Sequence, residues 1–379
     1  MKKIKILADE KIPFLHGVLE PYADVIYLPG NKIDKATVKD ADALLIRTRT
    51  KCDEFLLEGS SVKFIATATI GFDHIDTEYC NARNIAWFNA PGCNSASVQQ
   101  YITAVLMQLS SEYRLILEDK IIGIIGVGNV GSKVQRNAEI LGMKVKLNDP
   151  PRARKEGEKG FVDLDEILET CDIITLHVPL NRSGDDKTFH LFSEKLFAKM
   201  KPGAWLFNTS RGEVVETAAL KNAINSGKLA GAVLDVWENE PAIDLELLKK
   251  AFIATPHIAG YSTDGKANGT SQVVRLLAGF FGLPLAEFYP VNLPEPHIPE
   301  IEIDMAGKSA FRVISESVLH TYPVMSDHRR LQEHPETFEQ QRGQYPLRRE
   351  FPAYTVKLRN ADPGTVSTLG KLGFKVSLK

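Results

Sequence analysis

The sequence predicts an α/β protein built from two doubly wound parallel-sheet domains, with a smaller α+β domain at its C-terminus. Short apolar segments alternate with segments of helical periodicity in two series, one before residue 90 and one between residues 120 and 255. This alternation is typical of parallel sheets that are covered by helices on both faces. The 379 residues also exceed the size of one ordinary domain, so we expect two or three.

The first series predicts a parallel sheet of five strands. The expected strands lie at 3–8, 23–28, 42–47, 63–68 and 84–88. Apolar residues at helical spacing then predict a long helix over 97–117, with Ser97 as its N-cap. We expect this helix to carry the chain out of the first domain.

The second series predicts a doubly wound unit of six strands. These strands are expected at 120–126, 144–148, 172–177, 203–208, 231–236 and 251–255. Helices are expected between them, for example at 193–200 and 216–226. A further helix at about 265–281 is expected to carry the chain back to the first domain.

The character of the chain changes from about residue 284. Five prolines between residues 283 and 302 predict a linker. An amphipathic helix near 307–320 and a strand–helix–strand pattern over 353–378 follow. A tail of about ninety residues is small for a catalytic domain, so we expect it to form an interface or to cap a substrate site.

Composition and charge exclude several classes of function. The net charge is −2, so the chain lacks the basic field that would attract nucleic acid or anionic lipid. The N-terminus lacks the apolar segment of a signal peptide, and no apolar stretch is long enough to cross a membrane. The four cysteines form no CxxC pair. We therefore expect a cytoplasmic protein with no bound metal and no nucleic-acid or membrane partner.

One glycine-rich turn indicates dinucleotide binding. Gly126, Gly128 and Gly131 form a GxGxxG motif after an apolar strand and before a helix. In that context the first glycine permits a tight turn, the second lets the backbone approach a pyrophosphate and the third lets helix and strand pack closely. The helix N-terminus adds unpaired N–H groups and a positive dipole end. We expect a Rossmann-like domain here.

Asp149 indicates which dinucleotide is preferred. It follows the second strand of this unit, eighteen residues after Gly131. A carboxylate at this point accepts hydrogen bonds from the ribose hydroxyls and repels a 2′-phosphate, so the sequence favours NAD over NADP. Arg152 and Arg154, just downstream, are the one indication of NADP.

Three charged side chains follow later strands of the same sheet. Arg211, Glu240 and His257 each come after an apolar segment, at the edge where ligands gather in open α/β sheets. Hydride transfer from a 2-hydroxy acid needs a cation for the substrate, a base for its hydroxyl proton and a carboxylate to orient that base. Each residue alone is more often structural than catalytic, but their joint placement behind the glycine turn favours catalysis.

With these residues in place, the sequence resembles the D-2-hydroxyacid dehydrogenase family. The resemblance is carried by the glycine motif, by Asp149 and by the segments NTSRGEVV, LDVWENEP and TPHIAGYS. It implies NAD in a cleft between two similar domains and a catalytic set of Arg211, Glu240 and His257. The cofactor-binding residues that it implies, with Asp235 at the nicotinamide carboxamide, are Gly126, Gly128, Asn129, Val130, Gly131, Asp149, Thr209, Ser210, Asp235 and Gly260.

Longer segments resemble one branch of this family, the erythronate-4-phosphate dehydrogenases. They are ATATIGFDHID, NAPGCNSASV, LNDPPRA and HIAGYSTDGKANGTSQV, together with the extra C-terminal domain. This branch implies NAD-dependent oxidation of 4-phospho-D-erythronate to 2-oxo-3-hydroxy-4-phosphobutanoate, in the biosynthesis of pyridoxal 5′-phosphate (vitamin B6). It also implies a homodimer formed through the C-terminal domain, and substrate contacts by Thr48, Thr69 and Tyr261.

The phosphate of such a substrate needs cations. Arg47 and Arg49, at the end of a strand in the first domain, are the first candidates. Arg348 and Arg349 in the tail are the second, as side chains that one protomer would supply to its partner. A run of charges is more often a solvated face, and the tail pair carries that interpretation more strongly than the first pair.

The predicted organisation has three domains. A substrate-binding domain covers 1–96 and 258–284, an NAD-binding domain covers 97–257, and a dimerisation domain covers 285–379. Two alternatives for the function stay open. One is the same chemistry on another acid, such as 3-phosphoglycerate, glycerate or D-lactate. The other is a non-catalytic, NAD-sensing scaffold protein that keeps the fold.

Overall fold

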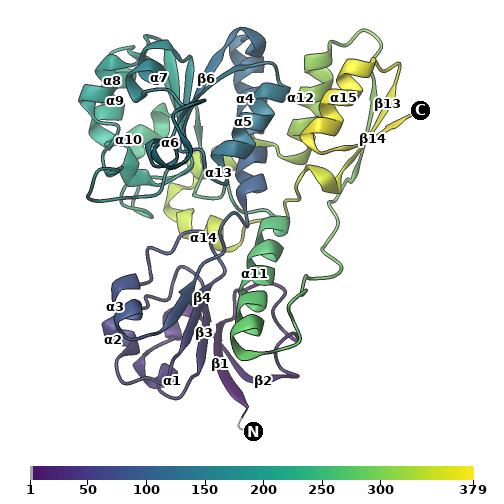
Figure 1. Cartoon of the computed structure of the whole chain (residues 1–379). Coiled ribbons are helices and arrows are strands. Elements are labelled where there is room, and N and C mark those ends of the chain that lie inside the picture. The colour runs from purple at the N-terminus through teal and green to yellow at the C-terminus, as the bar shows by residue number, and fades with distance from the viewer. Residues whose placement is uncertain (1–2) are drawn as a thin grey trace. The chain divides into compact units, whose positions relative to one another are not determined.

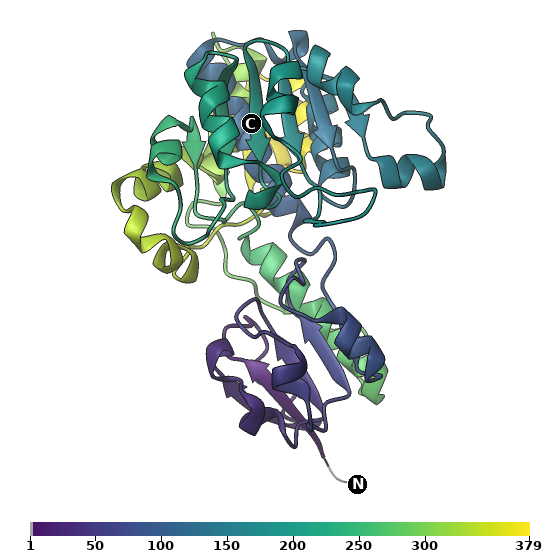
Figure 2. The same cartoon turned by 90° about the vertical axis from the view of Figure 1, so that its left-hand side faces the viewer.

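The computed structural model describes residues 3–379, which form two compact units (Figures 1 and 2). The first unit runs to Asn94 and resumes over Ser262–Pro294, and the second comprises Ser95–Tyr261 and Glu295–Lys379. The expected third domain therefore belongs to the second unit, because one apolar core continues from the six-stranded part into the tail. Every helix within residues 3–379 is too short or too polar to span a membrane.

The first unit is a five-stranded parallel sheet between two layers of helices. In the order β2-β1-β3-β4-β5, its strands are β1 (Ile4–Asp9), β2 (Ala23–Leu28), β3 (Ala43–Ile46), β4 (Phe64–Thr67) and β5 (Ala86–Phe88). Its helices are α1 (Lys35–Val38), α2 (Glu54–Leu57), α3 (Thr77–Ala82) and α11 (Thr263–Phe281). Figure 1 shows α11 along one face of the sheet, where Val273 and Leu277 pack against Ile6. The five expected strands and the returning helix are confirmed.

The second unit contains a six-stranded parallel sheet in the order β11-β10-β9-β8-β6-β7. Its strands are β6 (Ile121–Ile125), β7 (Lys144–Asn148), β8 (Ile173–Leu176), β9 (Ala204–Asn208), β10 (Leu229–Leu234) and β11 (Ile253–Ala254). Its helices are α4 (Ser95–Tyr113), α5 (Gly131–Ile140), α6 (Pro150–Glu156), α7 (Leu164–Thr170), α8 (Glu194–Lys199), α9 (Thr217–Asn225) and α10 (Leu245–Lys250). The strand order reverses between β6 and β8, which is where open sheets of this kind bind ligands.

Both faces of this sheet are buried, which explains why its strands are apolar throughout. In β9, Trp205 and Phe207 pack into the core on the side of α4, while Leu206 packs into the core on the opposite side. Successive side chains of a strand point to opposite faces, so a strand with helices on both sides needs apolar residues at every position. The continuous apolar segments of the sequence follow from this requirement.

The tail forms a three-stranded parallel sheet of its own, β12 (Glu300–Asp304), β13 (Thr355–Arg359) and β14 (Lys375–Leu378), in that order. Its helices are α12 (Ala310–Thr321), α13 (Val324–Glu333), α14 (Phe338–Gly343) and α15 (Pro363–Leu372). Figure 1 shows α12 beside α4, and Val313 and Val318 share one core with Val105. Single-turn 3-10 helices lie at Gly30–Lys32, Leu117–Asp119, Gly212–Val214, Pro335–Thr337 and Phe351–Ala353.

One local prediction is wrong, and two segments differ from their expected bounds. The long helix begins at Ser95, so Ser97 lies inside α4 as a buried residue whose hydroxyl donates to the carbonyl oxygen of Ala259 at 2.8 Å. The expected linker over 283–302 ends inside strand β12, because Ile301 and Ile303 alternate with acidic residues and supply one apolar face despite the preceding prolines. The last strand of the larger sheet, expected at 251–255, is present but covers only Ile253–Ala254, where it pairs with β10.

Candidate active site

The glycine-rich turn has no room for side chains at two of its three glycines. Gly126 has φ +87°, and a Cβ atom there would meet the carbonyl oxygen of His177 at 2.6 Å. A Cβ atom at Gly131 would lie 2.0 Å from the carbonyl oxygen of Gly126. The turn therefore closes on itself and packs against the end of β8 in a way that only glycine permits.

The start of α5 fits the pyrophosphate of a dinucleotide. Its N-cap residue, Val130, has no side-chain cap within the described chain, while the N–H groups of Ser132 and Lys133 donate to the carbonyl oxygens of Gly128 and Val130 at 3.1 and 3.0 Å. The position of Gly128 is open, since a Cβ atom there would meet nothing within 4 Å among the described residues outside its own neighbours. Uncapped N–H groups at the positive end of a helix dipole bind phosphate. Asn129 lies between these residues in the same turn.

Asp149 stabilises this turn from the end of β7. Its Oδ2 accepts the N–H of Val127 at 2.8 Å, and its Oδ1 accepts the N–H of Arg152 at 3.0 Å, which caps α6. An ionised carboxylate has about four lone-pair sites, so two of them remain for the ribose hydroxyls that the sequence predicts as partners. Asp149 thus combines a structural contact with the geometry expected of a ribose-binding residue.

The two arginines that were the one indication of NADP both have carboxylate partners. Arg152 pairs with Glu156, with 2.6 Å between Nη2 and Oε2, and also donates to the carbonyl oxygen of Val127 at 2.5 Å. Arg154 pairs with Asp186. These ion pairs offset the positive charge that a 2′-phosphate would require, so the structure agrees with NAD.

A histidine that the sequence reasoning missed lies beside this turn. His177 follows β8, with Nε2 at 3.0 Å from the hydroxyl of Thr175 and Nδ1 at 3.4 Å from that of Thr209. Desolvation lowers the pKa of His177 to about 3, so its ring is neutral at physiological pH. It thus contacts one of the predicted cofactor residues, Thr209. His177 comes directly after an apolar strand, and Arg211, Glu240 and His257 also follow apolar strands, so the same sequence signal could have identified it.

Arg211 follows β9 in a turn that Asn208 holds. The amide nitrogen of Asn208 donates to the carbonyl oxygen of Arg211 at 2.9 Å, and its Oδ1 accepts the N–H of the buried Ser210 at 3.0 Å. Arg211 Nη1 in turn donates to the carbonyl oxygen of Ser210 at 2.8 Å. The predicted cofactor residues Thr209 and Ser210 therefore belong to the turn that positions the guanidinium.

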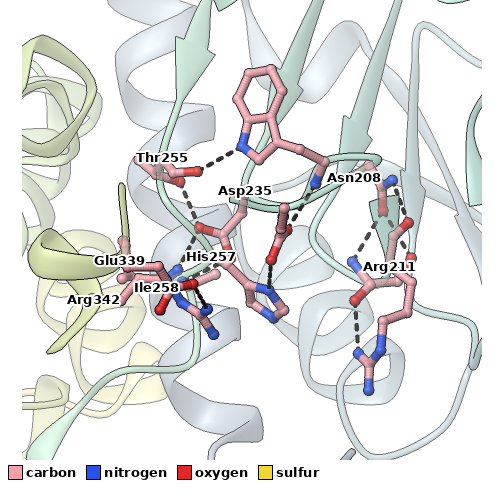
Figure 3. A network of polar contacts seen from close by, with 12 residues as sticks. Asn208, Arg211, Asp235, Thr255, His257, Ile258, Glu339 and Arg342 are labelled. Carbon is pink, nitrogen blue, oxygen red and sulfur yellow. Dashed lines mark hydrogen bonds and ion pairs between the residues drawn. The ribbon is translucent and has the colours of Figure 1, made fainter. Parts of the chain in front are cut away.

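The three segments that carry Arg211, Glu240 and His257 are neighbours in space. They follow β9, β10 and β11, which lie side by side in the sheet. A Cβ atom at Gly212 would lie 2.0 Å from the carbonyl group of Trp237, so the backbone after Arg211 touches the segment that leads to Glu240. Figure 3 shows His257 between Arg211 on one side and Arg342 on the other.

Asp235 anchors the loop that carries His257. Its Oδ1 accepts the hydroxyl of Thr255 at 2.6 Å and the N–H of Ile258 at 2.8 Å, and its Oδ2 accepts the N–H of Ala259 at 2.9 Å. Burial, which leaves 1% of the residue exposed, raises the pKa of this carboxyl, against the opposing effects of the His257 charge and these hydrogen bonds. Both oxygens thus serve the protein itself, and the nicotinamide contact stays a prediction.

His257 adopts a backbone conformation that is rare for residues other than glycine. Its φ is +56°, and its N–H donates to the carbonyl oxygen of Asp235 at 2.7 Å. A left-handed conformation of this kind costs about 1–3 kcal/mol and persists only where the surroundings impose it. The conformation aims the ring at Glu240, with Nδ1 at 2.8 Å from Oε2.

Glu240 determines which nitrogen of His257 carries a proton. Burial alone would raise the pKa of the Glu240 carboxyl, but the charge and hydrogen bond of His257, the N–H of Trp237 and the charge of Arg342 together hold this pKa below its usual value. An ionised carboxylate only accepts, so Nδ1 of His257 is the donor. Nε2, on a side chain that is 32% exposed, then holds the lone pair of the neutral ring.

The tail reaches this site through two arginines, of which Arg342 lies on α14. Its Nη2 donates to the hydroxyl of Tyr261 at 3.3 Å, and its Nη1 lies 3.1 Å from a carboxylate oxygen of Glu339. Tyr261 is one of the predicted substrate residues, and Gly260 before it lies in the turn after the His257 loop. The sequence reasoning did not single out Arg342, because a charge on a short tail helix resembles any solvated residue.

Arg348 binds the carbonyl oxygens of the His257 loop, whereas Asp235 binds its N–H groups. Its Nη2 donates to the carbonyl oxygen of Ala259 at 2.5 Å and of Ile258 at 3.2 Å, while its guanidinium lies 4.4 Å from the ring centre of Tyr322. The suggestion that one protomer supplies Arg348 to its partner's site is wrong, because the residue is 4% exposed and bound to its own chain. The next residue, Arg349, is buried as well.

The remaining predicted substrate residues lie in the first unit, at the ends of its adjacent strands β3 and β4. Arg47 donates from Nη1 to the carbonyl oxygen of Lys11 at 3.1 Å, whereas Thr48 and Arg49 are exposed. The hydroxyl of Thr69 donates to the carbonyl oxygen of Gly71 at 2.9 Å. Contacts of these residues with a substrate stay predictions.

The fold and this set of residues define an NAD-dependent dehydrogenase. The glycine turn, the uncapped helix and Asp149 suit a dinucleotide, and the oriented imidazole beside an arginine suits hydride chemistry on a hydroxy acid. Within residues 3–379, no group of three or more His, Cys, Asp or Glu side chains is arranged to hold a metal ion.

Comparison with known proteins identifies the family. Residues 97–259 match the model of the D-isomer specific 2-hydroxyacid dehydrogenase NAD-binding domain, and residues 292–373 match a domain of unknown function (DUF3410). The chain is 52% identical to the erythronate-4-phosphate dehydrogenase of Bacteroides thetaiotaomicron over 93% of its own length and 99% of that protein.

Two solved structures share the fold of the larger part of the chain. The D-lactate dehydrogenase of Aquifex aeolicus, complexed with NAD and lactic acid, matches with a TM-score of 0.61 at 28% identity, over 76% of this chain and 99% of its own. The NAD-bound 3-phosphoglycerate dehydrogenase of Entamoeba histolytica matches with a TM-score of 0.63 at 26% identity, over 77% and 100%. The chain therefore belongs to the erythronate-4-phosphate dehydrogenase family, a branch of the D-2-hydroxyacid dehydrogenases.

Proposed function

We propose that this protein oxidises 4-phospho-D-erythronate at C2 with NAD, giving 2-oxo-3-hydroxy-4-phosphobutanoate in the biosynthesis of pyridoxal 5′-phosphate. The single observation that carries the proposal is the Glu240–His257 pair, held at 2.8 Å in a strained loop of a dinucleotide-binding unit. The substrate comes from the relative that is 52% identical over nearly the whole chain and is named for it.

The proton of the C2 hydroxyl goes to His257. Glu240 is ionised and accepts the Nδ1–H of His257, so Nε2 holds the lone pair that takes this proton. As the O–H bond breaks, the C2–O bond becomes a carbonyl and the C2–H bond breaks. NAD, when bound, accepts the hydride from C2. Glu240 then stabilises the imidazolium by a hydrogen bond between opposite charges.

Arg211 supplies the cation for the reacting end of the substrate. Its guanidinium is a rigid fork of donors, which suits the carboxylate at C1 or the oxygen at C2 as that oxygen becomes a carbonyl. The turn that Asn208 holds fixes the backbone of Arg211. This limits the motion of the guanidinium relative to the substrate. Thr48, Thr69 and Tyr261 are proposed as further substrate contacts.

The residues proposed to hold NAD fall into three groups. The glycine turn with Asn129 and Val130 binds the pyrophosphate, and Asp149 binds the adenosine ribose. The remaining members, which are proposed to surround the nicotinamide half, are Thr209, Ser210, Asp235 and Gly260.

The assembly and location of the protein are part of the proposal. We infer a homodimer formed through residues 285–379, because a tail with its own sheet and exposed edge strand β14 offers a surface for a second copy. We also infer a cytoplasmic enzyme, in keeping with four buried cysteines that form no CxxC pair.

A substrate panel tests the function. Purified protein with NAD is given 4-phospho-D-erythronate, 3-phosphoglycerate, glycerate or D-lactate, and the absorbance of the reduced cofactor is followed. We expect the highest kcat/KM for 4-phospho-D-erythronate. A preference for another acid would move the enzyme to another branch, and NAD binding without turnover of any acid would favour the scaffold alternative.

Arg49→Ala tests the first-unit cation within the same assay. Because Arg49 is exposed at the end of β3, a contact with the substrate phosphate would raise the KM for the phosphorylated acid on its removal. Lys63→Ala is the matched control, since Lys63 is an exposed cation at the start of the neighbouring strand β4, at the opposite end of the sheet. An unchanged KM in Arg49→Ala would remove this residue from the proposal.

A further inference from the structure

We propose that Arg342, from the tail, binds the phosphate of the substrate and makes the enzyme selective for a phosphorylated 2-hydroxy acid. The inference rests on the proposed function and gives one task to the tail domain of unknown function, whose match spans residues 292–373. It differs from the partner-supplied arginines considered above, because Arg342 serves the site of its own chain.

Arg342 lies within the same constellation as the catalytic pair. Its Nη2 is 3.3 Å from the hydroxyl of Tyr261, and its guanidinium is 5.9 Å from the ring centre of that tyrosine. Tyr261 follows the His257 loop by four residues. The electrostatic influence of Arg342 extends to the carboxyl of Glu240. A cation from a segment some eighty residues away in the sequence is thus part of the surroundings of the reactive histidine.

The Arg342 guanidinium still has N–H groups to donate along the edge formed by Nε and Nη2. Nη1 faces the carboxylate of Glu339, and Nη2 keeps one further N–H after its bond to Tyr261. Nε is buried, yet it has no hydrogen-bond partner anywhere in residues 3–379. Arginine commonly binds phosphate with two parallel N–H groups, and the Nε–Nη2 edge offers such a pair. An unpartnered buried N–H is uncommon in native proteins and calls for an explanation.

The order of the charged groups matches the order of groups in the substrate. Figure 3 shows Arg211 on one side of His257 and Arg342 with Glu339 on the other. In 4-phospho-D-erythronate the reacting C2 lies between the carboxylate at C1 and the phosphate at C4. A substrate whose carboxylate faces Arg211 and whose C2 hydroxyl faces His257 would therefore extend its phosphate toward Arg342.

A purely structural role for Arg342 is the competing explanation. The residue forms an i,i+3 ion pair with Glu339, and such pairs are common on helices. However, 15% of the Arg342 side chain is exposed against 35% for Glu339, so the cation is the inward partner. A pair that served only the helix surface would leave both side chains in solvent. Arg312, which is 68% exposed and pairs with Glu316 on α12, is such a case and provides the control.

The experiment compares two substrates that differ only in the phosphate, 4-phospho-D-erythronate and D-erythronate. The measured quantity is the ratio of their kcat/KM values with NAD. We expect Arg342→Ala to lower this ratio 10- to 100-fold, Arg342→Lys to lower it less, and Arg312→Ala to leave it within two-fold of wild type, as roughly expected for one charge-assisted contact. Glu339→Gln should raise the ratio slightly, since it removes a carboxylate that competes with the phosphate.

Inorganic phosphate gives an independent readout. It should inhibit the wild-type enzyme competitively against 4-phospho-D-erythronate, and inhibition should weaken in Arg342→Ala. NADH binding and the thermal unfolding midpoint of each variant show whether the variant is folded. If Arg342→Ala is not folded, Arg342→Lys takes its place in both measurements.

Several results would overturn the proposal. An equal loss on both substrates would make Arg342 a residue that positions Glu240 or Tyr261. A ratio that falls in Arg49→Ala but holds in Arg342→Ala would assign the phosphate to the first unit. By contrast, a wild-type enzyme that oxidises neither substrate, while it turns over another acid, contradicts the proposed function itself.

Discussion

The second unit contains two glutamate–histidine pairs that look alike locally. His257 pairs with Glu240 at 2.8 Å, and His190 pairs with Glu238 at 2.6 Å. Both histidines have a left-handed φ, +56° and +50°. The exposed fractions of the side chains are 32% and 19% in the first pair, and 35% and 19% in the second. Distance, burial and backbone conformation therefore do not separate the two pairs.

The surroundings separate them. In the second pair, Glu238 also accepts the N–H of Thr217 at 2.8 Å, at the start of α9, and His190 stacks on Phe189 with 4.0 Å between ring centres. Burial would raise the pKa of Glu238, but Thr217 and His190 hold it below its usual value. This carboxylate is thus used to begin a helix.

In the first pair, the neighbouring side chains are of kinds that can bind a substrate or cofactor. The loop of His257 is anchored by the buried Asp235, and arginines lie on both sides of the ring (Figure 3). The comparison teaches that a glutamate–histidine pair becomes a candidate catalyst through the cations and the dinucleotide turn around it.

Replacing each histidine by glutamine gives the largest expected contrast. His257→Gln should lower kcat by about 10³-fold, because it removes the general base, whereas His190→Gln should change kcat less than two-fold. Steady-state kinetics with 4-phospho-D-erythronate and NAD measure both. Comparable losses in the two variants would mean that the pairs are not functionally distinct.

Replacing each glutamate sharpens the contrast. Glu240→Gln should lower kcat about 10- to 100-fold, because the ring of His257 loses the carboxylate that orients it. Glu238→Gln should change kcat less than about two-fold and lower the free energy of unfolding by about 1 kcal/mol through the weakened start of α9. Steady-state kinetics and denaturant unfolding measure these effects, and a comparable loss of kcat in Glu238→Gln would contradict the comparison.

Arg348→Met tests whether the tail holds the loop of the first pair. Arg348 donates to the carbonyl oxygens of Ile258 and Ala259, and methionine fills similar volume without these donors. We expect kcat to fall about ten-fold, with a lower unfolding midpoint, because the ring of His257 loses alignment. Gln332→Met is the control: it removes a tail donor to the carbonyl oxygen of Leu248, away from this loop, and should leave kcat unchanged.

His177 gives the smallest expected effect, on stability in acid. Its pKa of about 3 lies below the value near 6.5 of an unfolded chain, so the unfolded state binds more protons between these pH values. Stability should therefore fall as pH drops from 6.5 toward 3, by at most about 1.4 kcal/mol per pH unit and by less because the ring keeps some solvent contact. Denaturant unfolding of His177→Gln should show a shallower slope.

Much of the fold was predictable because it depends on local pattern. Strands buried on both faces must be apolar along their whole length, and this made nearly every strand of the two larger sheets recognisable. Strand β12 was missed because it has only one apolar face and lies among prolines, so alternation over five residues was a weak signal. The prediction that Ser97 caps the helix was wrong, because a serine inside a buried helix can form a hydrogen bond to another segment instead.

The sequence by itself determined the chemistry available: a glycine turn, a carboxylate after the second strand, and an arginine, a glutamate and a histidine after later strands. Spacing along the chain and the rules of parallel sheets place these groups at one edge. Only the tertiary structure decided which partners they have. Asp235 and Arg348 hold the His257 loop, and Arg342 arrives from the tail, because contacts between distant segments depend on packing that no local pattern encodes.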